Sequence, residues 1–365
     1  MKDPKFVFTE FTNSSNTGML MRAMREFEVT WNLFGKDGFA ITFSFTDEEF
    51  EIAVKESIFQ PDETITISYN DGSTSWILIN GNILEMETNL GSPKKDEDEE
   101  DDSGEDDVTE QVTAIQNTLT LRGIGFQTKM DSNKEFRTFE NKNRKTIADE
   151  ILGNYATSGY INNAMTPDNT PQSDEFIIAQ FGQSDYEFFR YLGKYSGWVL
   201  CSIPNDKKIY WGSEDDLFSD KKRYKMTATS PYVKKVAFKF EPGQQLKPMG
   251  SVMEEDTDEV EDIAASNDQN VNMQSLEAAE AKTLTEYLEA KSAGKITRID
   301  LSLDNLQFGD FLVPPCKAEV FGASDKFNGN YYISKVTHKI QLADMVGGEG
   351  EHSVTQTLEM RAEPS

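Results

Sequence analysis

Two runs of alternating large apolar side chains, joined by a glycine-containing link, constrain the fold of this chain most strongly. The first run covers residues 27–33, the second covers residues 39–45, and the link between them is residues 35–38. In both runs an apolar residue falls on every second position, which places one face of a strand in a core. A short link containing glycine joins such strands as an antiparallel hairpin. The pattern therefore predicts a β-hairpin with one buried face.

A second hairpin is predicted directly after the first. Residues 65–69 alternate before a turn at Asn70-Asp71-Gly72, residues 76–79 form the returning arm, and Asn80-Gly81-Asn82 marks the next turn. The chain also holds 24 Phe, 12 Tyr and 4 Trp, side chains that favour strands over simple helical bundles. Residues 1–130 are therefore predicted to form a small antiparallel β-domain.

An acidic stretch interrupts this first domain at about residues 93–109. Ten of the twelve residues from Asp96 to Asp107 are acidic, so the segment buries no apolar area and repels itself. We expect a disordered loop. Calcium binding is the alternative, although an unbroken acidic run lacks the ligand spacing and the glycine of a calcium loop. Strand patterning resumes near Val112 and continues through Leu119 and Leu121, so the loop interrupts the domain without ending it.

Residues 131–245 are predicted to form an α+β middle region. Thr146 and Asp149 form a capping pattern for one helix, and Ser184 and Glu187 form the same pattern for a second. Phe188, Tyr191 and Leu192 give the second helix its buried stripe, and Gly197 is expected to end it. A hairpin with arms at residues 198–201 and 208–211 then follows.

The last third of the chain begins with a second acidic segment. Residues 246–294 are predicted to form an acidic low-complexity insertion with a helix at residues 275–291. Strand patterns return at residues 296–301, 308–313, 331–336 and 354–360, so residues 295–365 are predicted to form a second small β-domain. The fold class expected is α+β and mostly β, with two small antiparallel β-barrels flanking the middle region.

Charge and composition exclude several classes of function. The formal net charge of −28 repels phosphate backbones, so nucleic-acid binding is disfavoured. No stretch approaches the roughly 20 apolar residues that cross a bilayer, and we expect no membrane insertion. The N-terminus has no secretory signal pattern. Cys201 and Cys316 lie in apolar strand contexts and are expected to be buried, reduced thiols of a protein made in a reducing cytoplasm.

The residues with catalytic or metal-binding potential form no recognisable site. His338 and His352 are the only histidines, and neither has a second ligand at zinc spacing. The 64 acidic residues are too many to single out a hydrolytic pair. We therefore expect no catalysis, no metal and no cofactor. Phe188 is expected in the core, whereas Phe189 on the same helix is a candidate to face another subunit.

Several motifs resemble those of one protein family, the tail hub proteins of contractile phages and injection systems. The strongest runs from Gln180 to Phe189 and on to Gly197-Trp198, and a second runs from Gly309-Asp310 through residues 327–338. Late-control gene D proteins and the N-terminal region of VgrG proteins show similar segments in the same order. The residues that carry this resemblance, and are the interface candidates, are Gln180, Phe181, Ser184, Asp185, Phe188, Phe189, Gly197, Trp198, Gly309, Asp310, Gly329, Tyr331 and His338.

The resemblance implies a structural protein with a mechanical role. Such hubs are homotrimers in which each protomer carries two tube-like barrels, so that six barrels match a hexameric tail tube and the other end fits a trimeric spike. The implied partners are the spike protein, the tail tube protein, other baseplate proteins and the tape measure protein. The chain ends soon after its second β-domain, so the spike is expected to be a separate gene product.

The resemblance also implies assembly in the bacterial cytoplasm, followed by incorporation into a virion tail or an injection particle. It does not distinguish a phage from a type VI apparatus or an extracellular injection system. Two alternatives from other classes stay open at this point. One is a tail-associated peptidoglycan hydrolase, and the other is a calcium-dependent secreted binding module that uses the acidic runs.

Overall fold

The fold is taken from a computed structural model of the chain. The described residues are 5–8, 17–55, 59–60, 62, 64–70, 75–90, 117–140, 142–157, 163–165, 177–194, 198–241, 250–253, 260–263, 296–304, 308, 311–341 and 353–363. The predicted acidic loop at 93–109 and the predicted helix at 275–291 lie outside these residues. Most of the insertion at 246–294 does so too.

The described part of the chain is mostly strand, with short helices between the strands. The helices are α1 (Thr17–Ala23), α2 (Asp47–Lys55), α3 (Gln127–Asp131), α4 (Arg144–Thr157), α5 (Asp185–Lys194) and α6 (Glu214–Phe218). The first strands are β1 (Lys5–Phe8), β2 (Met24–Asn32), β3 (Gly38–Phe45), β4 (Thr64–Asn70), β5 (Ser75–Asn89), β6 (Asn117–Gly125), β7 (Lys134–Glu140), β8 (Asn163–Met165) and β9 (Ile177–Ser184). The others are β10 (Val199–Ile203), β11 (Lys208–Gly212), β12 (Arg223–Thr227), β13 (Val233–Glu241), β14 (Gly250–Met253), β15 (Val260–Ile263), β16 (Ile296–Asp304), β17 (Lys317–Phe321), β18 (Gly329–Gln341) and β19 (Ser353–Ala362).

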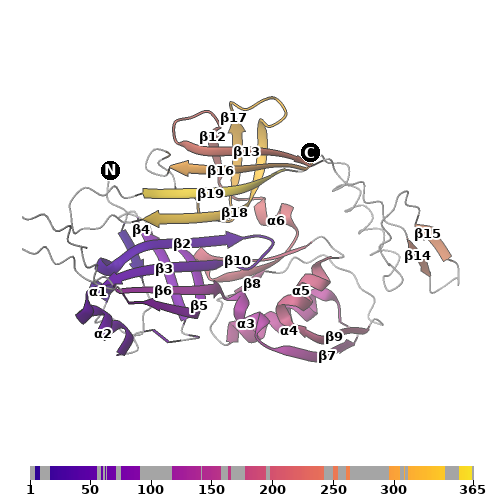
Figure 1. Ribbon diagram of the computed structural model, residues 1–365. Coiled ribbons are helices and arrows are strands. Elements are labelled where there is room, and N and C mark those ends of the chain that lie inside the picture. Colours follow the sequence, from indigo (N-terminus) through magenta and orange to yellow (C-terminus); the bar gives the residue numbers. More distant parts are fainter. Residues whose placement is uncertain are drawn as a thin grey trace, which may run out of the picture.

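A 12-stranded sheet dominates the fold. Its strands follow the order β1-β4-β5-β6-β3-β2-β18-β19-β16-β13, and β12 joins it through β17. Neighbouring strands run antiparallel, except that β12 and β17 are parallel. Figure 1 shows β3, β2, β18, β19 and β16 side by side, with α3, α4 and α5 grouped beside the sheet near β7 and β9. The prediction of an α+β, mostly β fold is confirmed.

The large sheet consists of two units with the same strand order. We call β1–β6 the first β-unit, and β12, β13 and β16–β19 the second β-unit. In each unit the first strand pairs with the fourth, and the order continues through the fifth, sixth, third and second strands. Matching pairings also carry matching register shifts, at Met24/Glu26 and Val233/Lys235, and at Ile83/Glu85 and Ile333/Lys335.

The two units are joined in one ladder. Glu26–Asn32 of β2 pairs with Lys335–Gln341 of β18, so the second strand of the first unit leads directly into the second unit. The pairings of the described strands therefore trace an open sheet and no closed barrel. This differs from the expectation of two separate barrels, because β2 gives its outer edge to the other unit.

The first predicted hairpin is confirmed as β2 and β3, but the predicted turn at Asn80-Gly81-Asn82 is wrong. β5 continues through these residues to Asn89 and pairs with β6. A Cβ atom on Gly81 would lie 2.5 Å from the carbonyl oxygen of Ile124. The glycine therefore marks a close approach of two backbones within the sheet.

The predicted strand at residues 308–313 is also wrong where the structure describes it. Residues 311–313 have no regular secondary structure. The backbone N–H of Leu312 donates to the side-chain oxygen of Gln356 in β19 at 2.9 Å, and not to a backbone carbonyl as in a strand ladder. Pro314 and Pro315 follow, and proline has no N–H to continue a ladder.

The helices differ from the prediction in their starts and in their number. α4 begins at Arg144, before the predicted cap at Thr146, because Asn143 caps it by accepting from the Thr146 N–H at 2.8 Å. Helices α1, α2, α3 and α6 were not predicted. Thr46 and Glu49 form a capping box at the start of α2 that the sequence displays.

The middle region has its own core. Buried side chains of α3, α4, α5, β10 and β11 form one cluster, which includes Met130, Ile151 and Trp211. The β-units have separate clusters, centred on β2–β6 and on β16–β19. Strands β12 and β13 fall within residues 131–245, yet they pair with β17 and β16 of the second β-unit.

Candidate functional site

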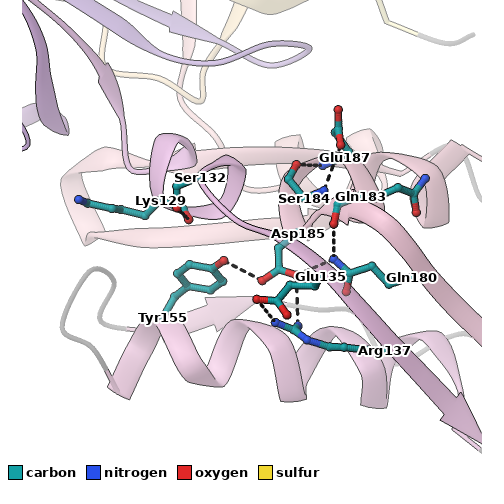
Figure 2. Close-up of polar contacts among 10 residues, drawn as sticks. All are labelled: Lys129, Ser132, Glu135, Arg137, Tyr155, Gln180, Gln183, Ser184, Asp185 and Glu187. Carbon is teal, nitrogen blue, oxygen red and sulfur yellow. Dashed lines mark hydrogen bonds and ion pairs between the residues drawn. The ribbon is translucent and has the colours of Figure 1, made fainter.

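The segment that carries the strongest sequence motif lies where β9 meets α5. The Ser184 hydroxyl accepts from the Glu187 N–H at 3.1 Å, and the Glu187 carboxylate accepts from the Ser184 N–H at 3.0 Å (Figure 2). The predicted capping box is therefore confirmed. It fixes the direction in which α5 leaves β9 and directs Asp185 into the protein.

Asp185 is a buried carboxylate with three donors from three different elements (Figure 2). It accepts from Gln180 at 2.9 Å, from Arg137 at 3.2 Å and from the Tyr155 hydroxyl at 2.7 Å. Burial, together with the hydrogen bond to Asp185, raises the pKa of Tyr155 above its ordinary value. The carboxylate thus connects β7, α4, β9 and α5.

A second buried carboxylate, Asp37, lies in the turn between β2 and β3. It accepts from the Asn32 N–H at 2.9 Å, from Gln127 at 2.9 Å and from the Ser202 hydroxyl. Burial raises the pKa of Asp37 to about 6 despite these hydrogen bonds. The sequence showed only a turn here, since aspartate is common in turns for local reasons.

Lys36, beside Asp37, links the first β-unit to the capping serine. Its ammonium group pairs with Asp131, and the other carboxylate oxygen of Asp131 accepts from the Ser184 hydroxyl at 2.5 Å. Through Lys36 and Asp37, the turn between β2 and β3 therefore holds the first β-unit against the middle region. No motif in the sequence indicated this connection.

The two phenylalanines that follow Glu187 are both buried. Phe188 stacks on Phe139 with ring centroids 5.8 Å apart, and Phe189 meets Trp211 edge-on at 5.4 Å. The core position predicted for Phe188 is confirmed, whereas the expectation that Phe189 faces another subunit is wrong. Helix α5 is covered by the β7–β9 strands and by the β10–β11 hairpin, so both aromatic faces lie inside.

Phe181 is the exposed member of the motif. Its side chain is 79% exposed and meets the 72%-exposed Phe136 edge-on at 5.5 Å, on the outer face of the β7–β9 ribbon. Gly182 follows with a φ of +66°, a conformation that favours glycine.

Trp198 is half-buried and packs against Trp211, with ring centroids 4.6 Å apart. It also lines a cleft of about 480 Å³ with Tyr186.

The candidates near the C-terminus belong to the second β-unit. Tyr331 is buried and donates to the Phe327 carbonyl at 2.8 Å. His338 is buried in β18 and stacks on Phe311 at 4.2 Å, and burial lowers its pKa to about 3. Gly329 is exposed at the start of β18.

The predicted residues do not gather in one place. Gln180, Ser184 and Asp185 meet in the middle region, while Tyr331 and His338 lie in the sheet of the second β-unit. The predicted residues Gly197, Gly309 and Asp310 lie outside the described residues. The motif residues that the structure describes therefore lie in separate structural elements and not in a common pocket.

Two of the unpaired edges of the large sheet form a surface that no sequence motif marked. Among the described strands, β13 pairs only with β16, and residues 84–89 of β5 pair only with β6. Leu84 is 46% exposed and Leu90 is 72% exposed at the β5 edge. Free edges of this kind are templates for pairing with another strand.

Within the described residues, no group of three or more His, Cys, Asp or Glu side chains is arranged to hold a metal ion. Cys201 and Cys316 are buried and unbonded to each other, as predicted. A search of the described residues for helices that could span a membrane finds none.

Comparison with known proteins places the fold. No family model matches the sequence, and no curated protein matches it. Solved structures match over nearly the whole chain. A tail protein from Neisseria meningitidis is 10% identical, with a TM-score of 0.63 over 93% of this chain and 92% of that one. The 43 kDa tail protein of prophage MuSo2 from Shewanella oneidensis is 12% identical, with a TM-score of 0.55 over 93% and 94%.

A third structure comes from a secretion apparatus. It is a component of the type VI secretion system of E. coli, described as structurally similar to the T4 bacteriophage tail proteins gp27 and gp5. That protein is 10% identical, with a TM-score of 0.56 over 97% of this chain and 76% of its own. The resemblance inferred from the motifs is thus matched in three dimensions: the chain has the fold of phage tail proteins and of a type VI secretion component.

Proposed function

We propose that this chain is the structural hub subunit of a contractile phage tail or a related injection system. Three copies form a ring with two tube-like β-units from each, so that six units meet the hexameric tail tube on one side. The other side of the ring receives a trimeric spike made from a separate protein. The role is mechanical, and no reaction is catalysed.

The repeat within the sheet is the observation that carries this proposal. Two units with one strand order, joined through β2 and β18, give a single chain two equivalent surfaces. A trimer of such chains approximates six-fold symmetry while keeping an exact three-fold axis. The fold shared with tail proteins and a type VI component supports the same assignment.

The motif residues support a structural role as well. Asp185 is saturated by Gln180, Arg137 and Tyr155, and Ser184 is occupied by the helix cap and by Asp131. The partners in this proposal are the spike, the tail tube protein, other baseplate proteins and the tape measure protein. The negative net charge of −28 disfavours contact with nucleic acid.

The test is the mass of the native particle, measured by light scattering on the full chain alone and with a candidate spike protein. The proposal predicts three copies of the chain per particle when the spike is present, and no dependence on nucleic acid. A chain that stays monomeric alone, with the spike and with the tube protein would overturn the proposal.

A further inference from the structure

The junction between the two β-units provides a template for a contact between two copies of the chain. Within one chain, the second strand of the first unit (β2) pairs with the end of the fifth strand of the second unit (β18). Thr30 and Thr337 are opposite each other, with their hydroxyl oxygens 2.9 Å apart, and Lys339 pairs with Glu26 at 2.6 Å. This internal junction uses one second strand and one fifth strand.

Each chain also has one second strand and one fifth strand left over. These are β13, the second strand of the second unit, and residues 84–89 of β5, the fifth strand of the first unit. Neither edge has a further strand partner in the described part of the chain. One free edge of each type is what a head-to-tail contact between copies requires.

The repeat makes residues of β2 equivalent to residues of β13, and residues of β5 equivalent to residues of β18. Met24 of β2 and Val233 of β13 stand at the same register shift opposite Phe43 and Leu303, which makes Val29 equivalent to Phe238. The shift after Ile83 in β5 matches the shift after Ile333 in β18. The register of the internal junction can therefore be transferred to the two free edges.

Apolar side chains are more buried on β2, which pairs with β18, than on β13, which lacks a neighbour on the equivalent side. Phe27, Val29 and Trp31 of β2 are each only 1% exposed. In β13 the equivalent apolar residues Val236 and Phe238 are only partly buried. The unpaired second strand thus retains apolar surface that its counterpart has covered.

We infer that β13 of one copy pairs antiparallel with residues 85–89 of β5 in a second copy of this chain. Transfer of the internal register places Lys239 opposite Glu87, Phe238 opposite Thr88 and Ala237 opposite Asn89. The inference deepens the proposed function and rests on it for the number of copies in the ring. The strand edges, the register and the charges come from the repeat itself.

Charge supports this pairing and opposes the alternatives. At the internal junction the second strand is acidic, with Glu26 and Glu28, and the fifth strand is basic, with Lys335 and Lys339. At the free edges the signs are reversed, because β13 carries Lys235 and Lys239 while β5 carries Glu85 and Glu87. Opposite charges on facing strands stabilise a pair, and like charges destabilise it.

The reversed signs make the two junctions distinct. A β13 edge placed on β18 would bring lysines together, and a β2 edge placed on β5 would bring glutamates together. In the inferred register, Glu85 lies opposite Glu241, but Arg122 is 3.4 Å from Glu85 in the same unit. Lys239 is the diagonal neighbour of Glu85 across the junction in this register, and within its own chain it pairs with Asp300.

Cysteine cross-linking tests the register. The variants E87C and K239C are prepared separately in the full chain, mixed with the candidate spike and oxidised. We expect a disulfide between the two variants and none in either variant alone. The displaced pair E87C with K235C is the control, since these positions are not opposite in the inferred register.

Two outcomes separate this inference from the proposed function. A trimer by light scattering without the E87C–K239C cross-link, or with the displaced pair linked equally well, overturns the strand pairing while the hub assignment stands. A chain that is monomeric with every partner overturns both. Formation of the in-register disulfide alone supports the pairing.

Charge reversal gives a second readout that does not depend on oxidation. E87K and K239E each place like charges at all three junctions of a ring, so we expect each to weaken trimer formation about tenfold or more. The double variant E87K/K239E restores the opposite charges and should recover most of the loss. K145E on α4 is the matched control and should assemble like the unmodified chain. Failure of the double variant to recover, with both singles folded, would contradict the inference.

Discussion

The two β-units share a strand order but differ in their loops. Between the second and third strands, the first unit has the short turn at residues 33–37, whereas the second unit has residues 242–295. Between the fifth and sixth strands the first unit has residues 90–116, whereas the second has residues 342–352. Both acidic segments of the sequence thus fall in connections of a repeated frame. The hydrogen-bond ladder limits insertions within strands, whereas lengthening a connection adds little to the entropic cost of closing it.

Two equivalent parts of the β-units differ between them, namely the connection after the second strand and the outer edge of that strand. The short turn of the first unit carries Lys36 and Asp37, which hold the middle region. The matching connection of the second unit is the site of the acidic insertion. The edges differ as well, since β2 pairs with β18, while β13 has no second strand partner among the described strands. The same strand order thus makes an internal junction at β2, and in the contact that we infer its counterpart β13 meets a second copy.

The largest expected effect comes from removing equivalent core side chains from the two units. Phe43 and Leu303 occupy the same position in the repeat, and both are fully buried. We expect Phe43→Ala to lower the free energy of unfolding by about 3–5 kcal/mol and Leu303→Ala by about 2–5 kcal/mol. Because β2 and β18 share one ladder, both variants should shift a single transition in denaturant.

Tryptophan fluorescence and circular dichroism together measure this prediction. The four tryptophans, Trp31, Trp76, Trp198 and Trp211, all precede the strands of the second unit. If Leu303→Ala shifted the circular dichroism transition and left the fluorescence transition in place, the units would unfold independently. Phe34→Ala, at a 41%-exposed position, is the control and should cost far less.

A smaller effect concerns Asp37, the buried carboxylate in the turn between β2 and β3 of the first unit. Burial raises the pKa of Asp37 from an ordinary value of 3.8 to about 6, so the folded protein binds this proton more tightly than the unfolded chain. Its contribution to stability is fully present below about pH 4 and is lost as the pH rises through 6. The difference in free energy of unfolding between unmodified protein and Asp37→Asn should therefore change by about 2 kcal/mol between pH 4 and pH 7.

Unfolding in urea across that pH range measures the difference directly. Many other carboxylates titrate over the same range, so the comparison with the variant isolates Asp37. Asp325→Asn, at an exposed turn position, is the control and should follow the unmodified protein at every pH. A constant difference between the unmodified protein and Asp37→Asn would contradict the raised pKa.

Local patterns in the sequence predicted strands, helix caps and core aromatics, since these depend on neighbours along the chain. The alternation in residues 27–45 and the cap at Ser184 are examples. The pairing of Thr30 with Thr337 was out of reach, because it joins positions 307 apart and leaves no periodic signal. Two similar β-domains were predicted, but the strand-by-strand equivalence between them was not, because the equivalent strands share a burial pattern without sharing residue identities and the connections between them differ in length.

The candidate site shows the same division. Ser184 and Phe188 could be assigned from spacing along one helix. The burial of Phe189 depends on the β10–β11 hairpin, and the role of Asp37 depends on Gln127 and Ser202 far along the chain. Three-dimensional context therefore decides which side of a helix is covered and which turn carboxylate is buried.

The smallest effect sharpens the comparison between the inner and the outer junction. The hydrogen bond from Lys339 lowers the pKa of Glu26, so this pair stabilises the fold above the ordinary pKa of glutamate and loses that effect as the pH falls. Both side chains are about 40% exposed, which limits the coupling free energy to about 0.2–1 kcal/mol. A double-mutant cycle with Glu26→Gln and Lys339→Met should detect this coupling in the monomer, with salt reducing it.

The corresponding cycle with Glu87→Gln and Lys239→Met should show no coupling in the monomer and a similar coupling in the assembled ring. Coupling at Glu87 and Lys239 in the isolated chain would mean that the outer edges already meet within one copy, and the two junctions would then no longer differ in kind.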